Sequence, residues 1–133
     1  IPMPKLKKGN FVLTPLIGSI ACGIPNPSEE SYEDTYALPS DIFGTGTLFM
    51  LHAEGDSMIE AGISPGDLLV LRQQNSAEDG EIVVALINGE TTLKRLYHKG
   101  GKIVLHPENK RMQDIIVDNC DVQGVLVSCI KKY

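Results

Sequence analysis

Short apolar runs of strand length dominate the chain from residue 47 onward. Such runs, rich in Val, Ile and Leu and spaced at roughly ten residues, are typical of β-strands. An Asn88-Gly89 pair between two runs predicts a hairpin, because both turn residues must adopt positive φ, and another turn is expected at Gly100-Gly101. The pattern predicts a mainly β fold, a compact and partly closed antiparallel assembly. The runs are TLFMLHAE, DLLVLR, EIVVALIN, TTLKRLY, KIVLHP and VQGVLVSCIKK.

The first 46 residues lack this regularity. Residues 1–10 combine two prolines with three lysines and end in Gly-Asn, a composition that suits an extended linker. Between residues 24 and 46, three prolines and an acidic cluster argue against long helices and long strands. We therefore expect a surface arm there, with one helical turn. The other helical turn is expected at SMIEAG, residues 57–62.

Length and composition exclude several classes of protein. A chain of 133 residues fits one domain with a hydrophobic core. The net charge of −5 and the short basic runs argue against a nucleic-acid-binding face within this chain. No apolar run reaches the roughly 18 residues of a membrane span, and no signal sequence is visible. We expect a cytoplasmic protein without contact to a membrane.

The cysteines and histidines predict no metal site and no cofactor. The three cysteines form no C-x-x-C pair, which also argues against a disulfide framework and favours a reducing compartment. Cys120 and Cys129 fall in or beside the last apolar run, where buried free thiols are common. The histidines, His52, His98 and His106, show no H-E-x-x-H spacing, and we expect them to have surface or structural roles.

Ser57, in the sequence GDSM, is a candidate nucleophile. A serine becomes nucleophilic only when a base removes its proton, and no histidine has a spacing that indicates a triad. Lys94 is the other candidate base, since it lies in the middle of a predicted strand. To act it must be neutral, and burial must lower its pKa from about 10.4 by several units. The alternating pattern places Lys94 on one face with Thr92 and Leu96 but leaves open which face is buried.

Two acidic residues near this serine are a weaker pair of candidates. Asp56 and Asp67 lie in Gly-rich turns and could be taken for catalytic carboxylates. Acids in such turns more often accept hydrogen bonds from local backbone N–H groups. We therefore expect a structural role for both side chains.

Two segments carry a resemblance to a known family. GDSMIEAGISPGDLLVL and GEIVVALINGETTLKRLYHKGGKIVLHPENK resemble the catalytic domain of the LexA and UmuD family of self-cleaving proteins, S24-type serine endopeptidases. The resemblance runs from about residue 11 to the C-terminus. It implies a highly twisted fold shared with signal peptidases. It also implies a Ser-Lys dyad of Ser57 and Lys94, 37 positions apart, with the backbone N–H groups of Asp56 and Ser57 as oxyanion donors. Met58 is expected to pack in the core or to form a wall of the cleavage groove.

The resemblance also implies a substrate within the same chain. PLIGSIACGIP is similar to the cleavage-site segment of the family, and the cut would fall between Cys22 and Gly23. The small Cys22 side chain fits a tight pocket, and Gly23 allows the backbone to bend close to the nucleophile. Ile17, Ile20 and Ala21 are expected to anchor the loop.

Two positions depart from the family pattern. Ile24 follows the expected cut where the family carries an acidic residue, and His52 stands where a basic residue is common. The resemblance assigns residues 11–46 to the cleavage-site loop and connecting arm. It assigns residues 47–133 to the catalytic β domain, with a dimerisation strand near the C-terminus.

The resemblance implies a regulatory domain of a LexA-like repressor of the SOS response to DNA damage. Such a domain is a homodimer, a RecA filament on single-stranded DNA promotes its cleavage, and DNA is bound only through a domain upstream. An alternative is a UmuD-like subunit that is trimmed and then joins a Y-family translesion polymerase. A signal-peptidase-like enzyme that acts on other chains, and a non-catalytic dimerisation domain, are further alternatives.

Overall fold

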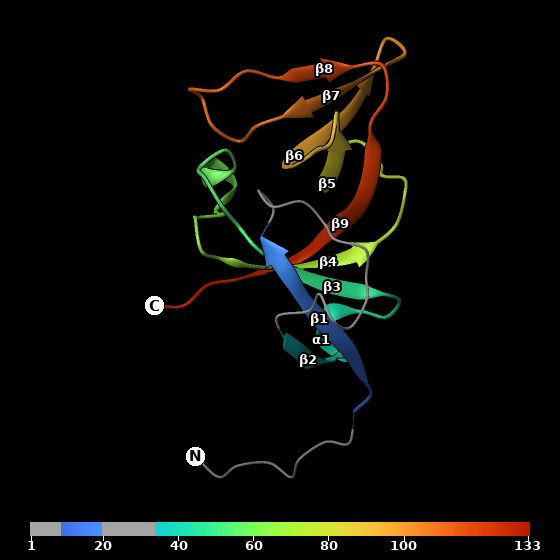
Figure 1. Cartoon of the computed structure of the whole chain (residues 1–133), viewed down its shortest axis with the longest axis vertical. Coiled ribbons are helices and arrows are strands. Elements are labelled where there is room, and N and C mark those ends of the chain that lie inside the picture. Colours follow the sequence, from blue (N-terminus) through green and yellow to red (C-terminus); the bar gives the residue numbers. More distant parts are fainter. Residues whose placement is uncertain (1–8, 20–33) are drawn as a thin grey trace.

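The computed structural model describes residues 9–19 and 34–133. Within them, nine strands form one sheet in the order β2-β1-β3-β4-β9-β5-β6-β7-β8 (Figure 1). Two short helical elements, α1 and η3, lie between strands. The bounds are β1 Phe11–Ser19, β2 Asp34–Pro39, α1 Ser40–Phe43, β3 Leu48–His52, η3 Ile59–Ala61, β4 Leu68–Gln73, β5 Ile82–Ile87, β6 Glu90–Lys99, β7 Lys102–His106, β8 Ile115–Val117 and β9 Asp121–Ile130.

The long strand β9 joins the two halves of the sheet. It pairs with β4 on one side and with β5 on the other, and both pairings are antiparallel. The register shifts once in each pairing, and such irregularities bend a strand and increase its twist. Figure 1 shows the result: β1 to β4 and β5 to β8 occupy opposite ends of the molecule, with β9 running between them.

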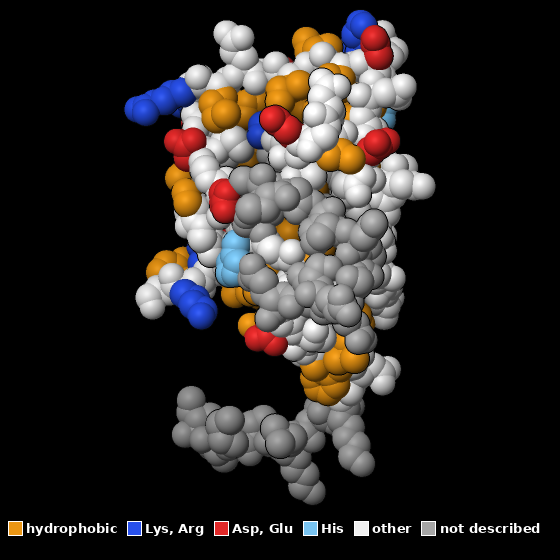
Figure 2. Space-filling view, in the orientation of Figure 1, with side chains coloured by type: hydrophobic (Ala, Val, Ile, Leu, Met, Phe, Trp, Pro, Cys, Tyr) orange, Lys and Arg blue, Asp and Glu red, His pale blue; other side chains and the backbone are white. Residues whose placement is uncertain are grey.

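Buried apolar side chains form three clusters along this sheet. One of them joins Leu51 of β3, Leu69 of β4 and Leu93 of β6 to Met58 and Ile63, which flank η3. The turn that follows β3 is therefore fixed to the core through apolar side chains on both sides of η3. On the face shown in Figure 2, Lys and Arg side chains of the described residues lie apart and form no single patch.

The six apolar runs coincide with β3, β4, β5, β6, β7 and β9, so the mainly β prediction is confirmed. Both turns are confirmed as well. Asn88 and Gly89 have φ values of 49° and 80°, and Gly100 and Gly101 have 59° and 77°. The helical turn expected at residues 57–62 is a three-residue 3-10 turn, Ile59–Ala61.

The pattern missed three strands, β1, β2 and β8, and one strand direction. β2 lies within the predicted irregular arm. β2 is an edge strand and Pro39 is its last residue, and proline in sheets is confined to such peripheral positions because it cannot donate to the ladder. β8 has only three residues, too few to show a period. The β1–β3 pairing is parallel, against the antiparallel expectation, while the other described pairings are antiparallel.

No helix in residues 9–19 and 34–133 is both long and apolar enough to cross a membrane.

Candidate active site

The turn that carries Ser57 begins where β3 ends. Gly55 has a φ of 74°, in the left-handed region that favours glycine, and η3 begins two residues after Ser57. Ala53 is held in a backbone pair, since its N–H donates to the Asp67 carbonyl and its carbonyl accepts from the Gly66 N–H, both at 2.8 Å. Met58 is 3% exposed and packs in the core. Ser57, between these fixed points, is half-buried. The backbone on both sides of Ser57 is therefore held in place.

Lys94 reaches this turn from the middle of β6. Its side chain is 5% exposed, and its Nζ lies 3.2 Å from Ser57 Oγ. The Nζ also lies 2.6 Å from Thr92 Oγ1 and 3.1 Å from the Leu93 carbonyl oxygen. Burial lowers the pKa of Lys94 below its usual 10.5, because the charged ammonium loses its hydration. Within the described residues no carboxylate pairs with Lys94, so no partner opposes this effect.

These contacts match what a neutral amine can form. Neutral Lys94 has two N–H donors and one lone pair. The Leu93 carbonyl is only an acceptor, and the Thr92 hydroxyl can accept as well. With both N–H groups donated to these two atoms, the lone pair remains for the Ser57 hydroxyl proton. The arrangement can thus perform general-base chemistry on Ser57.

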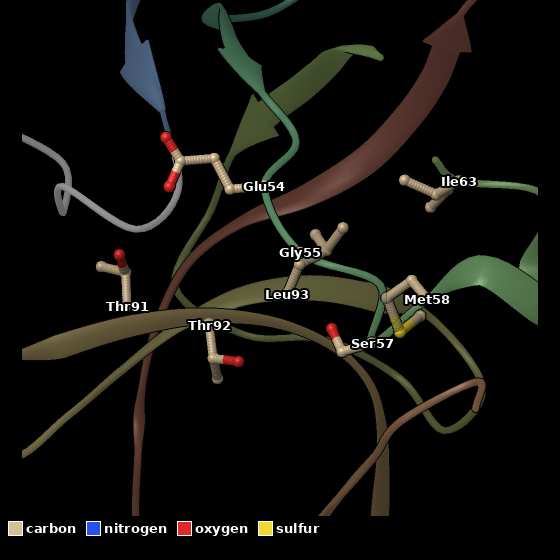
Figure 3. A pocket seen from close by; sticks show the side chains of 8 residues that line it. All are labelled: Glu54, Gly55, Ser57, Met58, Ile63, Thr91, Thr92 and Leu93. Carbon is tan, nitrogen blue, oxygen red and sulfur yellow. The ribbon is translucent and has the colours of Figure 1, made fainter. Parts of the chain in front are cut away.

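A pocket of about 130 Å³ opens beside Ser57 (Figure 3). Figure 3 shows the hydroxyls of Ser57 and Thr92 pointing into the space between the nucleophile turn and β6. A space of this size admits a small side chain. Its lining residues are Glu54, Gly55, Ser57, Met58, Ile63, Thr91, Thr92 and Leu93.

The strand β1 runs toward this pocket. It pairs in parallel with β3, and its last residue, Ser19, lies at the level of His52. Ile17, a predicted anchor, is 6% exposed and packs in the same cluster as Met58 and Leu93. The other predicted anchors, Ile20 and Ala21, and the predicted cleavage site, Cys22-Gly23, lie outside the described residues.

The other candidate residues have partners elsewhere. Asp67 accepts hydrogen bonds from the Ser64 N–H at 2.8 Å, from Cys129 Sγ at 3.4 Å and from Lys131 Nζ. It contacts neither Ser57 nor Lys94 through a hydrogen bond, which agrees with a structural role. Burial, together with the bond to Asp67, raises the pKa of the Cys129 thiol to about 11, so this thiol is a poor nucleophile.

Two histidines contact aspartates at positions distant in sequence from Ser57. His98 Nδ1 lies 2.7 Å from Asp79 Oδ1, and His106 Nδ1 lies 2.6 Å from Asp114 Oδ1. Among the residues that the structure describes, no three His, Cys, Asp or Glu side chains are grouped to hold a metal ion. The only titratable partner that the described residues offer to Ser57 is Lys94.

Sequence reasoning missed one polar residue at the site. Asn109 follows β7, is buried, and donates from Nδ2 to the carbonyl of Asp56 at 2.9 Å. A polar amide three residues after a strand carries no distinguishing signal, because exposed loops are rich in asparagine.

Comparison with known proteins places this geometry in a family. The family described as Peptidase S24-like matches residues 15–127, which include both Ser57 and Lys94. A LexA repressor from Frankia casuarinae is 46% identical over 125 residues, covering 94% of this chain and 49% of the relative. A LexA repressor from Clostridium botulinum (strain Langeland) is 46% identical over 127 residues, covering 95% and 63%. This chain therefore spans about half of the first relative and less than two thirds of the second. Because the family match extends over most of the chain, the protein belongs to the peptidase S24-like family.

Proposed function

We propose that this domain cleaves its own chain between Cys22 and Gly23, with Ser57 as nucleophile and Lys94 as general base. The observation that carries the proposal is the buried Lys94 Nζ, 3.2 Å from Ser57 Oγ. An amine that is desolvated and has no acidic partner loses its proton more readily than an exposed lysine. It can then accept the Ser57 proton as the hydroxyl attacks.

The reaction proceeds through an acyl-enzyme. Ser57 Oγ transfers its proton to Lys94 Nζ and bonds to the carbonyl carbon of Cys22, and the backbone N–H groups of Asp56 and Ser57 stabilise the oxyanion. The tetrahedral intermediate collapses, the bond to the Gly23 nitrogen breaks, and protonated Lys94 donates its proton to that leaving amine. Water, deprotonated by Lys94, then attacks the ester on Ser57. This step releases the Cys22 carboxylate and restores the hydroxyl.

The direction of β1 supports cleavage within one chain. β1 and β3 run in parallel, and Ser19 lies beside His52 at the start of the nucleophile turn. Cys22 follows Ser19 by three positions, and an extended chain spans about 10 Å over three positions. A substrate tethered at this distance has a high effective concentration. Control of the rate therefore depends on docking of the segment and on the charge of Lys94.

The names of the two relatives indicate a cellular role for this proposed activity. Both relatives are named LexA repressors, and this chain covers only part of each. We propose that it is the self-cleaving regulatory region of a LexA-like repressor of the SOS response, with DNA contacts made by a region outside this chain. A homodimer and activation by a RecA filament on single-stranded DNA belong to the same proposal. The relatives' name favours this role over that of a polymerase subunit.

Mass spectrometry of the purified chain tests the reaction. Samples held near pH 7 and near pH 10 are compared over time for the wild type, Ser57→Ala, Lys94→Met and a surface control, His98→Ala. We expect fragments 1–22 and 23–133 in the wild type and the control, faster at the higher pH, because the neutral fraction of Lys94 increases with pH. Neither dyad variant should yield them. A wild-type chain that stays whole at both pH values, with and without a RecA filament, refutes the proposal, as does cleavage in Ser57→Ala.

A further inference from the structure

The loop after β7, residues 107–112, is bonded to the nucleophile turn. The Glu60 N–H donates to the Glu108 carbonyl at 2.8 Å. In the other direction, the Lys110 N–H donates to Glu60 Oε2 at 2.9 Å, and the Glu108 N–H lies 3.4 Å from Met58 Sδ. Three contacts of this kind, spread over residues 58–60, hold the loop and the turn in one arrangement.

Asn109 adds a fourth contact, at the residue before the nucleophile. Its side chain is buried, with 8% exposed. Nδ2 donates to the Asp56 carbonyl at 2.9 Å, while Oδ1 accepts from the Arg111 N–H at 3.0 Å. Each end of the amide thus has a partner of the matching kind, which fixes its orientation. The Asn109 carbonyl also accepts from the Met112 N–H at 3.0 Å, so the loop that carries the amide is itself held.

This contact controls the orientation of the peptide bond between Asp56 and Ser57. The Asp56 carbonyl accepts a second hydrogen bond, from the Ile59 N–H at 3.2 Å. A trans peptide is planar, and its N–H points opposite to its C=O. Fixing the Asp56 carbonyl therefore fixes the Ser57 N–H in the opposite direction. The same plane sets the Cα of Ser57, from which Oγ extends toward Lys94.

The loop is also tied to the strand that carries Lys94. Arg95 follows Lys94 on β6, and its Nε lies 2.5 Å from Glu108 Oε1. Arg95 Nη1 donates in addition to the Gly80 carbonyl at 2.5 Å. Because the loop contacts both β6 and the turn, it connects nucleophile and base by a route separate from their own hydrogen bond. A loop placed this way can hold the distance between Ser57 Oγ and Lys94 Nζ before any substrate docks.

We propose that Asn109 is a positioning residue for the self-cleavage reaction: its amide aims the Asp56-Ser57 peptide so that Ser57 N–H and Oγ face the docked scissile bond. This inference rests on the proposed function. Asn109 does not touch the reacting atoms. Its effect passes through the backbone of Asp56, and it makes no hydrogen bond to Lys94, whose amine keeps its contacts with Thr92 and Leu93 of β6.

The pH profile of self-cleavage in the full chain tests the inference. First-order rates are measured between about pH 6 and pH 11 for the wild type, Asn109→Ala and the control Gln113→Ala, which alters an exposed side chain of the same connection. We expect Asn109→Ala to lower the maximal rate, reached on the plateau at high pH, about 10- to 100-fold. The midpoint, which is the pH at which the rate is half of this plateau, should stay unchanged. Gln113→Ala should match the wild type. Thermal unfolding of each variant shows whether the assay temperature lies well below its transition.

Three outcomes overturn the inference. A plateau rate in Asn109→Ala equal to that of the wild type shows a merely structural role. A shifted midpoint shows action through Lys94 instead of the Asp56-Ser57 peptide. If Asn109→Ala fails to fold, Asn109→Leu replaces it, because leucine has the same branching as asparagine but cannot donate a hydrogen bond to the Asp56 carbonyl. A plateau rate in Asn109→Leu equal to that of the wild type would likewise show a merely structural role. A wild type that does not cleave refutes the proposed function itself, whereas the first two outcomes leave cleavage by Ser57 intact.

Discussion

Thr92 Oγ1 lies 2.6 Å from Lys94 Nζ, closer than Ser57 Oγ at 3.2 Å. The two residues are separated by one position on β6, and side chains two apart on a strand share a face. Thr92 therefore lies next to the amine because both residues belong to β6, whereas Ser57 lies in a separate turn. Thr92 Oγ1 accepts a hydrogen bond from the amine, and in the proposed mechanism this bond helps to direct the lone pair of neutral Lys94 at Ser57.

We expect Thr92→Val to lower the self-cleavage rate about fivefold at the pH of the plateau, since one neutral hydrogen bond contributes about 1 kcal/mol and about 1.4 kcal/mol corresponds to a factor of ten. Valine keeps the shape of threonine and removes the acceptor. Thr92→Ser retains the hydroxyl and should restore most of the rate. The measurement is the first-order rate of fragment formation. A valine variant as fast as the wild type would show that Thr92 does not orient the amine.

Lys94 should make the fold less stable at neutral pH than a neutral residue would. Its folded-state pKa is lowered, by burial, from the usual 10.5, so the unfolded chain binds more protons between these two values. Stability therefore rises with pH across that window. We expect Lys94→Met to have the higher melting temperature near pH 7, with the difference decreasing as the pH approaches 10.5. Thermal unfolding followed by circular dichroism measures it, in the Ser57→Ala background so that no chain is cleaved. An equal difference at every pH contradicts the assignment to Lys94 titration.

Some of this architecture could be predicted from the sequence, for identifiable reasons. β3 to β7 and β9 are apolar runs bounded by glycine or polar turns, so their pattern is visible locally. The burial of Lys94 was not predictable from alternation, because β6 is buried on both faces: its neighbours Leu93 and Leu96 are 5% and 1% exposed although they lie on opposite sides. The pairing of Ser57 with Lys94 followed from family resemblance. Asn109 acts through a contact that spans 53 positions, and no local pattern encodes such a distance.

Gly124 on β9 should not tolerate a side chain. A Cβ built there would lie 2.7 Å from Phe49 Cζ and 3.1 Å from the Arg72 carbonyl oxygen. Because the backbone oxygen cannot move freely, the strand would have to shift. We expect Gly124→Ala to reduce the free energy of unfolding by about 1–3 kcal/mol. Denaturant unfolding measures it.

Two further variants make the Gly124 experiment specific. Gly9→Ala is a matched control, since a Cβ there meets nothing within 4 Å. Phe49→Leu removes the ring atoms that would clash, so the double variant Gly124→Ala with Phe49→Leu should lose less stability than the sum of the single variants. Strict additivity would show that the ring is not what excludes the side chain.

Asp67 should stabilise the fold only while it is ionised. The hydrogen bond from Lys131, and then the Ser64 N–H, hold the pKa of the Asp67 carboxyl below its usual 3.8. A carboxyl with a lowered folded-state pKa contributes stability that is complete above pH 3.8 and is lost as the pH falls through the lowered value. The same contact raises the pKa of Lys131 above 10.5. The contribution of Lys131 is therefore complete below 10.5 and is lost as the pH rises through its raised value.

These opposite signs define the experiment. Asp67→Asn keeps an oxygen for the Ser64 N–H and removes the charge. We expect it to lower the melting temperature by a constant amount between about pH 5 and pH 9, and by less at about pH 2 to 3, where the wild-type carboxyl is also becoming neutral. Lys131→Met should show the mirror image, with its deficit shrinking above pH 10.5. If the decrease in melting temperature caused by Asp67→Asn is as large at pH 2 as at pH 7, the carboxylate charge does not join the C-terminal end of β9 to the turn before β4. Packing around Ser64 must then hold these two segments together.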